Sequence, residues 1–362
     1  MSATREMWHA AGRAALDDRK RLLALQGLLW SGPLLVLGSF LARLPDPLSG
    51  DLRRPLQYLL EPLVTAWRQD QDLALFGYVG LQLLLLTLLW GLFGGALYRL
   101  AAVDLTRQSR EHALEAMAFA RRHWRGFVGA RVALWLGVVV PLAGAVLLAL
   151  FGRLDGWIGG LLLALAVGAA ILLALAAVLV AGVIAVAGFL AGPTVAAEDS
   201  DAFDAVSRTF TYASQGLPRL VSLRLLFAGG VLLGSTWRLL RMLLAGGLAW
   251  FALRVGAGPD ALERAFAILR AAGEPPDAAR LGIAPHDYLV AFVLALGAGS
   301  LVVLWLADLV SRVYCARMGV YLIRRQEVDR VPTTALHTPS RRPGHLTADE
   351  AGFIEVGRVE AP

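Results

Sequence analysis

The sequence predicts an all-α protein, a polytopic transmembrane helical bundle of about six spans with juxtamembrane amphipathic helices. The 362-residue chain is 57% hydrophobic and only 17% charged, with a mean hydropathy of +0.61. A soluble domain would be nearer 25% charged. Several windows exceed about 18 residues with almost no charge, which is the length a membrane-crossing helix requires. Short polar helices are expected between these windows as connectors.

The long apolar stretches form one expected bundle from residue 22 to residue 323. The expected spans are 22–42, 73–98, 127–150, 157–191, 219–237 and 286–323. The fourth would reach about 50 Å, against a hydrocarbon core near 30 Å, so we expect it to kink, tilt or project. In the fifth stretch, Arg238 and Arg241 interrupt the apolar run. Arginine at mid-membrane costs about 2.5–3.5 kcal/mol. Residues 238–253 either cross the membrane or lie on it, and the cheaper arrangement lays them along the far interface.

Three shorter segments are expected to lie on the membrane surface. Residues 1–21 carry apolar side chains on one side and end in a charged run, which predicts a cytoplasmic amphipathic helix. Residues 55–68 have leucines at helical spacing after Pro55, which predicts an outer interfacial helix. Residues 260–271 begin with a capping-box pattern and predict a second outer helix.

The polar segment 109–125 predicts a cytoplasmic helix before the third span. Arg121 and Arg122 suit its last turn, where the helix dipole is negative, and Gly126 ends it. Its apolar stripe consists of Leu114, Met117 and Trp124.

A second cytoplasmic helix is expected over residues 199–215. Asp199 and Ser200 are the expected N-caps, because their side chains can accept from unpaired backbone N–H groups. Asp204 and Arg208 form an expected i,i+4 ion pair. The expected apolar stripe is Phe203, Val206 and Phe210. This helix is too short and too charged to cross, and we expect a packed connector, with a docking or gating element as the alternative.

The distribution of arginine predicts the orientation. Arginines are concentrated in the loop 99–126, before the first span at Arg19 and Arg21, and after the last at Arg324 and Arg325. The positive-inside rule therefore predicts a multi-pass protein of the bacterial cytoplasmic membrane with both termini in the cytoplasm. The polar, proline-containing residues 324–362 are expected to form a disordered cytoplasmic tail.

The three expected cytoplasmic helices each precede a helical hairpin. This spacing suggests a weak threefold repeat of architecture, near residues 3–20, 109–125 and 200–215. The alternative is that any hairpin bundle needs connectors, and that connectors lie on membranes.

Four motifs resemble those of a family of bacterial polytopic membrane proteins of uncharacterised activity. They are 99–107 (RLAAVDLTR), 115–122 (EAMAFARR), 193–212 (PTVAAEDSDAFDAVSRTFTY) and 321–329 (YLIRRQEVD). A more distant likeness is to the membrane domain of some glycerophosphodiester phosphodiesterases, whose catalytic domain this chain lacks. Members of the main family usually carry Glu-Gly where this chain has Glu198-Asp199. The resemblance implies a fold and a membrane location but no reaction.

The polar residues expected inside the membrane are the candidates for chemistry, since they are costly there and often functional. Asp308 and Arg312 lie within the last span, and Arg224 lies near the start of the fifth. If these spans are antiparallel neighbours, Asp308 and Arg224 are placed to form an ion pair, read as a structural lock or, alternatively, as a proton or anion relay. The six histidines have no metal-ligand spacing and no catalytic motif occurs, so we assign no metal, no cofactor and no enzymatic activity.

Two function classes remain. The first is a membrane-organising or protein-interaction component; the alternative is a transporter or permease-like protein for a lipid or another apolar compound. The expected partners are membrane lipids and another membrane or cytoplasmic protein, not nucleic acid. No pattern predicts the oligomeric state.

Overall fold

A computed structural model describes residues 2–41, 73–106, 110–153, 156–257, 259–270 and 284–335. Within these ranges the chain is helical and contains no strand, which confirms the predicted all-α class. The expected interfacial helix 55–68 lies outside the described residues, as does most of the expected tail.

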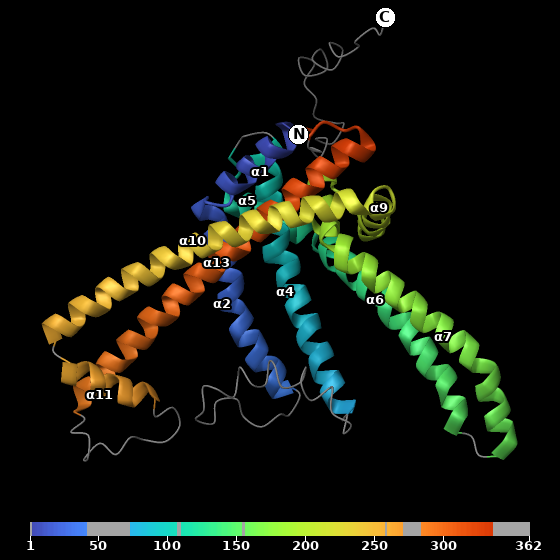
Figure 1. Cartoon of the computed structure of the whole chain (residues 1–362), viewed down its shortest axis with the longest axis horizontal. Helices are drawn as coiled ribbons and strands as arrows, with labels where there is room; N and C mark the ends of the chain where they lie inside the picture. Colours follow the sequence, from blue (N-terminus) through green and yellow to red (C-terminus); the bar gives the residue numbers. More distant parts are fainter. Residues whose placement is uncertain are drawn as a thin grey trace, which may run out of the picture.

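Three helical hairpins form the body of the protein (Figure 1). The first pairs α2 (Asp18–Leu41) with α4 (Leu73–Thr106), and the second pairs α6 (Trp124–Ala149) with α7 (Gly156–Ala187). The third pairs α10 (Leu217–Ala257) with α13 (Pro285–Asp329). The hairpins converge at one end, called here the junction, and diverge toward the other.

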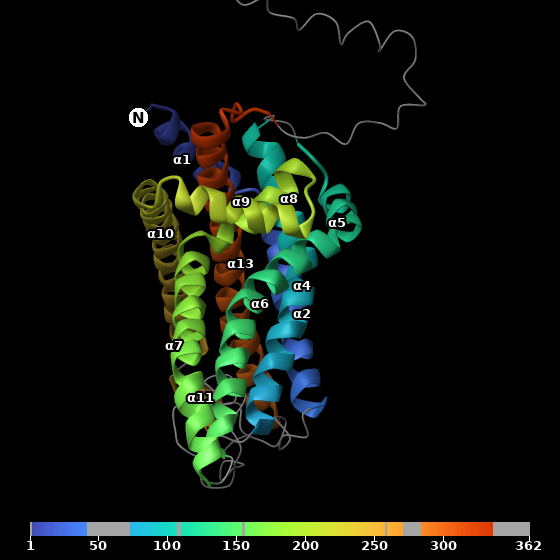
Figure 2. The ribbon, with the colours of Figure 1, turned by 90° about the vertical axis from the view of Figure 1, so that its right-hand side faces the viewer.

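The short helices gather at the junction. α1 (Ser2–Ala14), α5 (Ala113–Arg122), α8 (Ala191–Glu198) and α9 (Ala202–Ser214) all lie there, beside the end of α13. α9 lies across the ends of the hairpins (Figure 2). A 3₁₀ turn, η1 (Leu150–Arg153), and α11 (Pro259–Arg270) lie at the divergent end, where the Trp250 and Phe266 rings are 5.1 Å apart.

Five helical stretches in the described part are long and apolar enough to cross a membrane. They are Gly80–Thr106, Trp124–Ala149, Gly159–Glu198, Leu217–Gly256 and Pro285–Asp329. The chain is therefore a transmembrane helical protein. The first of the six expected spans corresponds to α2, which packs along α4 but is not among these five.

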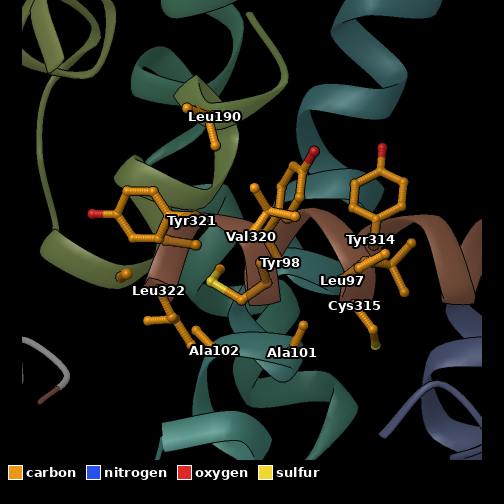
Figure 3. Packing of buried hydrophobic residues seen from close by; sticks show 14 of the residues in the cluster. Leu97, Tyr98, Ala101, Ala102, Leu190, Tyr314, Cys315, Val320, Tyr321 and Leu322 are labelled. Atoms are coloured by element: carbon orange, nitrogen blue, oxygen red, sulfur yellow. The ribbon is translucent and has the colours of Figure 1, made fainter. Parts of the chain in front are cut away.

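The hydrophobic core lies at the junction. Figure 3 shows α4 and α13 packed through Leu97, Tyr98 and Tyr314, with Leu190 from the 3₁₀ turn η2 (Gly188–Leu190) above them. Tyr321 of α13 points to the other side, where its ring lies 6.0 Å from that of Tyr212. The Tyr98 and Tyr314 rings are 4.5 Å apart. Away from the junction most large apolar side chains of α7, α10 and α13 are exposed, as helices that face lipid require.

Close helix approach in the core depends on glycine. A methyl group on Gly94 would collide with the Tyr314 hydroxyl, and one on Gly192 would collide with the Tyr98 ring. Small residues at helix contacts allow the two helix backbones to approach each other closely.

Several expected boundaries are corrected. The expected break after residue 237 does not occur, because α10 is one continuous helix to Ala257. The expected helix 109–125 is shorter, since α5 starts after an N-cap at His112 and α6 already begins at Trp124. The last helix runs to Asp329 rather than 323, because Arg324 and Arg325 are held by junction partners instead of entering a tail.

Candidate functional site at the hairpin junction

The most buried charge at the junction is the carboxylate of Asp308, which is 0% exposed. Its Oδ1 lies 2.9 Å from Nη2 of Arg21 and 3.5 Å from Nη1 of Arg238, and its Oδ2 lies 2.7 Å from Nε of Arg312. One carboxylate thus joins α2, α10 and α13. A buried charge is tolerated only when it is paired in this way.

The predicted Asp308–Arg224 pair is not formed. The Arg224 guanidinium instead donates from Nη1 to the carbonyl oxygen of Ala185 and lies 5.5 Å from the centroid of the Phe189 ring. The Arg312–Asp308 pair does form, one turn apart on α13. The sequence argument missed Arg21 and Arg238, although an arginine inside an apolar run was itself a signal that a carboxylate partner was needed.

A second buried charge is the single lysine, Lys20, which is 1% exposed. Its Nζ pairs with the carboxylate of Asp104 and donates to the carbonyl oxygen of Ala14 at 2.7 Å. Arg19 also contacts Asp104, with 3.4 Å between Nη2 and Oδ1, and pairs with Asp17. The hydrogen bond from Arg19 outweighs the opposing effect of burial and lowers the pKa of Asp17 to about 2. This group fastens α1 and α2 to α4.

A third group ties α9 to the end of α13. The Glu198 carboxylate accepts from the Tyr321 hydroxyl, pairs with Arg208, and lies 3.0 Å from Nε of Arg325. The Tyr212 hydroxyl donates to Asp329. Burial, together with this carboxylate, raises the pKa of Tyr212.

The predicted Asp204–Arg208 pair is present, with 3.1 Å between Oδ2 and Nε. The pKa of Arg208 is subject to burial, which lowers it, but the nearby Glu198 and Asp204 carboxylates dominate and raise it.

The N-cap of α9 is Asp201, not Asp199 or Ser200. The Asp201 side chain accepts from the backbone N–H of Asp204 at 2.8 Å. Asp199 instead ends α8 with φ of 57°, a left-handed conformation that favours glycine, and its carboxylate pairs with His123. The hydroxyl of Ser200 is buried without a hydrogen-bond partner in the described structure.

Most residues of the two predicted apolar stripes do not lie on the helix faces that pack against the core. α9 packs through Ala205, Thr209, Tyr212 and Ala213, while Phe203 remains 83% exposed and Val206 and Phe210 are half-buried. α5 packs through Ala116, Phe119 and Ala120, while Leu114 is 84% exposed, Trp124 is exposed and Met117 is half-buried. Each helix therefore packs on the core through small residues and one aromatic ring, Tyr212 in α9 and Phe119 in α5, and has a separate apolar edge outside it.

The sequence motifs that were singled out converge at this junction. Arg99 from the first motif donates from Nη1 to the carbonyl oxygen of Ala196 in the third, at 3.3 Å. It also lies 4.4 Å from the centroid of the Phe119 ring in the second motif. Glu198 and Tyr321 join the third motif to the fourth. The motifs therefore have a shared structural role in joining α4, α5, α8 and α13.

The charged side chains described at the junction are largely held in ion pairs. Within the described ranges, no cluster of three or more histidine, cysteine, aspartate or glutamate side chains could hold a metal ion. The single cysteine, Cys315, is buried. Comparison with protein-family models, with curated proteins and with solved structures found no match to this chain.

Proposed function

We propose that this chain is a membrane-organising or protein-interaction component, in which three membrane hairpins carry a rigid platform of short helices. The platform consists of α1, α5, α8, α9 and the end of α13. We place it, with both termini, on the cytoplasmic side of a bacterial cytoplasmic membrane, because its arginines follow the positive-inside rule. α2 is the sixth span in this proposal.

The observation that carries the proposal is that the buried charges of the junction are used to hold elements together. Asp308 joins three helices, Lys20 and Asp104 join two, and Glu198 joins α9 to α13. The outer edges of α5 and α9 remain free, with Leu114 and Phe203 exposed. A fixed frame with exposed apolar edges suits the recruitment of a partner or of the membrane surface.

The length of the charge-free part of α13 supports the membrane placement. No charged residue occurs from Tyr288 to Ala307, a stretch of about 30 Å at 1.5 Å per residue. This matches the hydrocarbon core of a bilayer. Asp308 would then lie at one hydrocarbon boundary, with the platform beyond it.

Co-purification in mild detergent, with mass spectrometry of proteins and lipids, tests the proposal. A partner should be recovered with the intact chain and lost when Leu114 and Phe203 are both changed to serine, while the chain remains folded and inserted. The paired changes Leu165→Ser and Leu172→Ser, on the exposed surface of α7, form the control. Identical recovery of the partner with both double variants would argue against an interaction role for these edges.

A transporter for a lipid or another apolar compound is the second candidate. It is favoured by a cavity of about 460 Å³ between α1, α10 and α13, lined by Trp8, Phe227, Trp237 and Arg312 among others. Transport in proteoliposomes that is abolished by Asp308→Asn without loss of the fold would favour this function over the first.

A further inference from the structure

Two arginines that lie on neighbouring helices at the junction, Arg224 and Arg317, have no carboxylate paired with them in the described structure. The Arg224 guanidinium on α10 donates to the carbonyl oxygen of Ala185, and Nη1 of Arg317 on α13 lies 3.4 Å from the Tyr98 hydroxyl. In contrast, many arginines of the junction pair with acids: Arg19, Arg21, Arg99, Arg208, Arg312, Arg324 and Arg325. The positive charge of Arg224 and Arg317 is therefore available to an anion from outside the chain.

Both arginines line one cavity. It has a volume of about 340 Å³ and lies between α10 and α13, with Phe189 of η2 at its edge. This volume is in the range of small-ligand sites. Apart from the arginines its lining is apolar: Phe189, Phe227, Ala228, Val231, Leu232, Leu309, Val313, Ala316 and Val320.

The charge in this groove is confined to the junction half. On α10 the lining begins with Arg224 and continues to Leu232, about 12 Å farther from the junction. On α13, Arg317 is followed in the same direction by Val313 and Leu309, about 12 Å away. One end of the groove thus carries two guanidinium groups, and the other end is apolar and leads toward the membrane-crossing part of the hairpin.

The exposed position of Arg224, on the platform side of Asp308, points to the same kind of ligand. Arg224 is exposed, and so are its neighbours Leu225 and Leu226. An arginine on an apolar outer surface is costly unless an anion or water reaches it. Phosphate groups of lipids lie at the boundary between hydrocarbon and water, and guanidinium groups bind them through two parallel hydrogen bonds.

We propose that this groove binds an anionic glycerophospholipid, with its phosphate on Arg224 and Arg317 and an acyl chain along Phe227, Val231 and Leu309. The lining contains no carboxylate that would pair with the ammonium group of a zwitterionic headgroup. The charge pattern therefore selects phosphatidylglycerol over phosphatidylcholine. This inference rests on the membrane placement in the proposed function and not on the recruitment of a protein partner.

The test uses the full chain, purified in a neutral detergent and depleted of lipid. Its thermal unfolding midpoint is measured during titration with phosphatidylglycerol, with phosphatidylcholine, or with inorganic phosphate. Phosphatidylglycerol should raise the midpoint far more than the other two. The paired changes Arg224→Gln and Arg317→Gln should weaken the apparent affinity for it by about tenfold or more, because two charge-assisted hydrogen bonds are lost.

The matched control is the pair Arg241→Gln and Arg254→Gln, which removes the same charge from exposed positions of α10 outside the groove. The control should bind phosphatidylglycerol like the unchanged chain. If the Arg224/Arg317 double variant does not fold, the two single variants are titrated in the same way.

Unchanged affinity in the variants would overturn the inference. An equal effect of phosphatidylcholine would show that the groove binds acyl chains without reading charge, and an equal effect of inorganic phosphate would show a free-anion site; both outcomes also overturn it. The membrane placement itself is tested separately by labelling at the two ends of the molecule. A chain that shows the expected placement but binds no anionic lipid therefore refutes this inference alone.

Discussion

At the scale of single residues, Asp308 is the position where the most elements depend on one side chain. It is the carboxylate partner of Arg21, Arg238 and Arg312, and the Nε of Arg238 already lacks a hydrogen-bond partner in the described structure. Removing the carboxylate would leave guanidinium groups from three helices close together without compensation. The cost of unpairing a buried ion pair is about 3–5 kcal/mol.

We predict that Asp308→Asn destabilises the protein by about this amount, and that it is coupled to Arg21→Gln but not to Arg224→Gln. The coupling energy between residues in contact is about 0.5–3 kcal/mol, whereas distant sites are additive. The coupling energy of each double-mutant cycle is measured from the free energy of unfolding in a series of detergent mixtures. Additivity in the Arg21 cycle would show that the ion pair at 2.9 Å contributes nothing to stability.

The left-handed backbone at Asp199 leads to a second prediction. Asp199→Ala should destabilise more than Asp199→Gly, by about 1 kcal/mol, because alanine retains the steric cost of a positive φ and glycine does not. Both variants lose the ion pair with His123, so their difference isolates the backbone contribution. Equal thermal midpoints for the two variants would contradict this explanation.

A third prediction concerns glycine packing. Gly192→Ala should cost about 1–3 kcal/mol because its methyl group collides with the Tyr98 ring. Gly182→Ala is the control, since nothing lies within 4 Å of the added carbon atom, and it should be neutral or stabilising. The thermal midpoints of the two variants in the same detergent provide the comparison. Similar losses at both positions would point to a general sensitivity of these helices.

At the scale of elements, the helices and their order follow from hydropathy and charge, whereas their contacts do not. The threefold arrangement of short helix and hairpin is present in the structure as α1 with α2–α4, α5 with α6–α7, and α8–α9 with α10–α13. The period of apolar residues in α9 indicates a helix correctly, but it selects Phe203, Val206 and Phe210 as the docking face. The helix instead docks onto α6 and α8 through Ala205, Thr209, Tyr212 and Ala213, a face that the apolar period does not select.

The continuity of α10 shows a second limit of sequence reasoning. The free-energy cost of placing one arginine in the membrane predicts that the span ends at Arg238. A carboxylate on another helix offsets this cost by pairing with the guanidinium group. Asp308 is 70 positions away in the sequence, and no local pattern places it 3.5 Å from Arg238. The same limit explains why Lys20–Asp104 was not anticipated.

The attachment of α9 can be tested as a unit. Glu198→Gln removes the charge that holds Arg208 and Arg325 and should increase amide hydrogen exchange throughout α9, by about tenfold or more for a loss near 1.5 kcal/mol. Glu115→Gln, at an exposed position on α5, should leave α9 unchanged. If the increase in amide hydrogen exchange is confined to the residues beside Glu198, α9 is held mainly by its apolar face.

At the scale of the whole molecule, the junction and the divergent ends are separated by the lengths of the hairpins (Figure 1). Ser207 on α9 and His286 at the start of α13 are both exposed and lie at these opposite ends. Native Cys315 is buried and should not react with an impermeant thiol reagent.

We therefore predict that a cysteine at Ser207 reacts only after cells are opened, and that one at His286 reacts in cells whose outer membrane is permeabilised. The positive-inside arrangement of arginines sets this direction. Fluorescent maleimide labelling, read on gels, measures both. Labelling of the two positions from the same side would refute the membrane placement of the proposed function.

The divergence of the hairpins has a mechanical consequence. Past the junction the arms have few neighbours from the rest of the chain, so surrounding acyl chains would fill the spaces between them. The distance between their far ends would then depend on lateral pressure and bilayer thickness, while the ion-paired junction stays fixed. A thinner bilayer should increase the angle between the three hairpins without changing the packing of the junction.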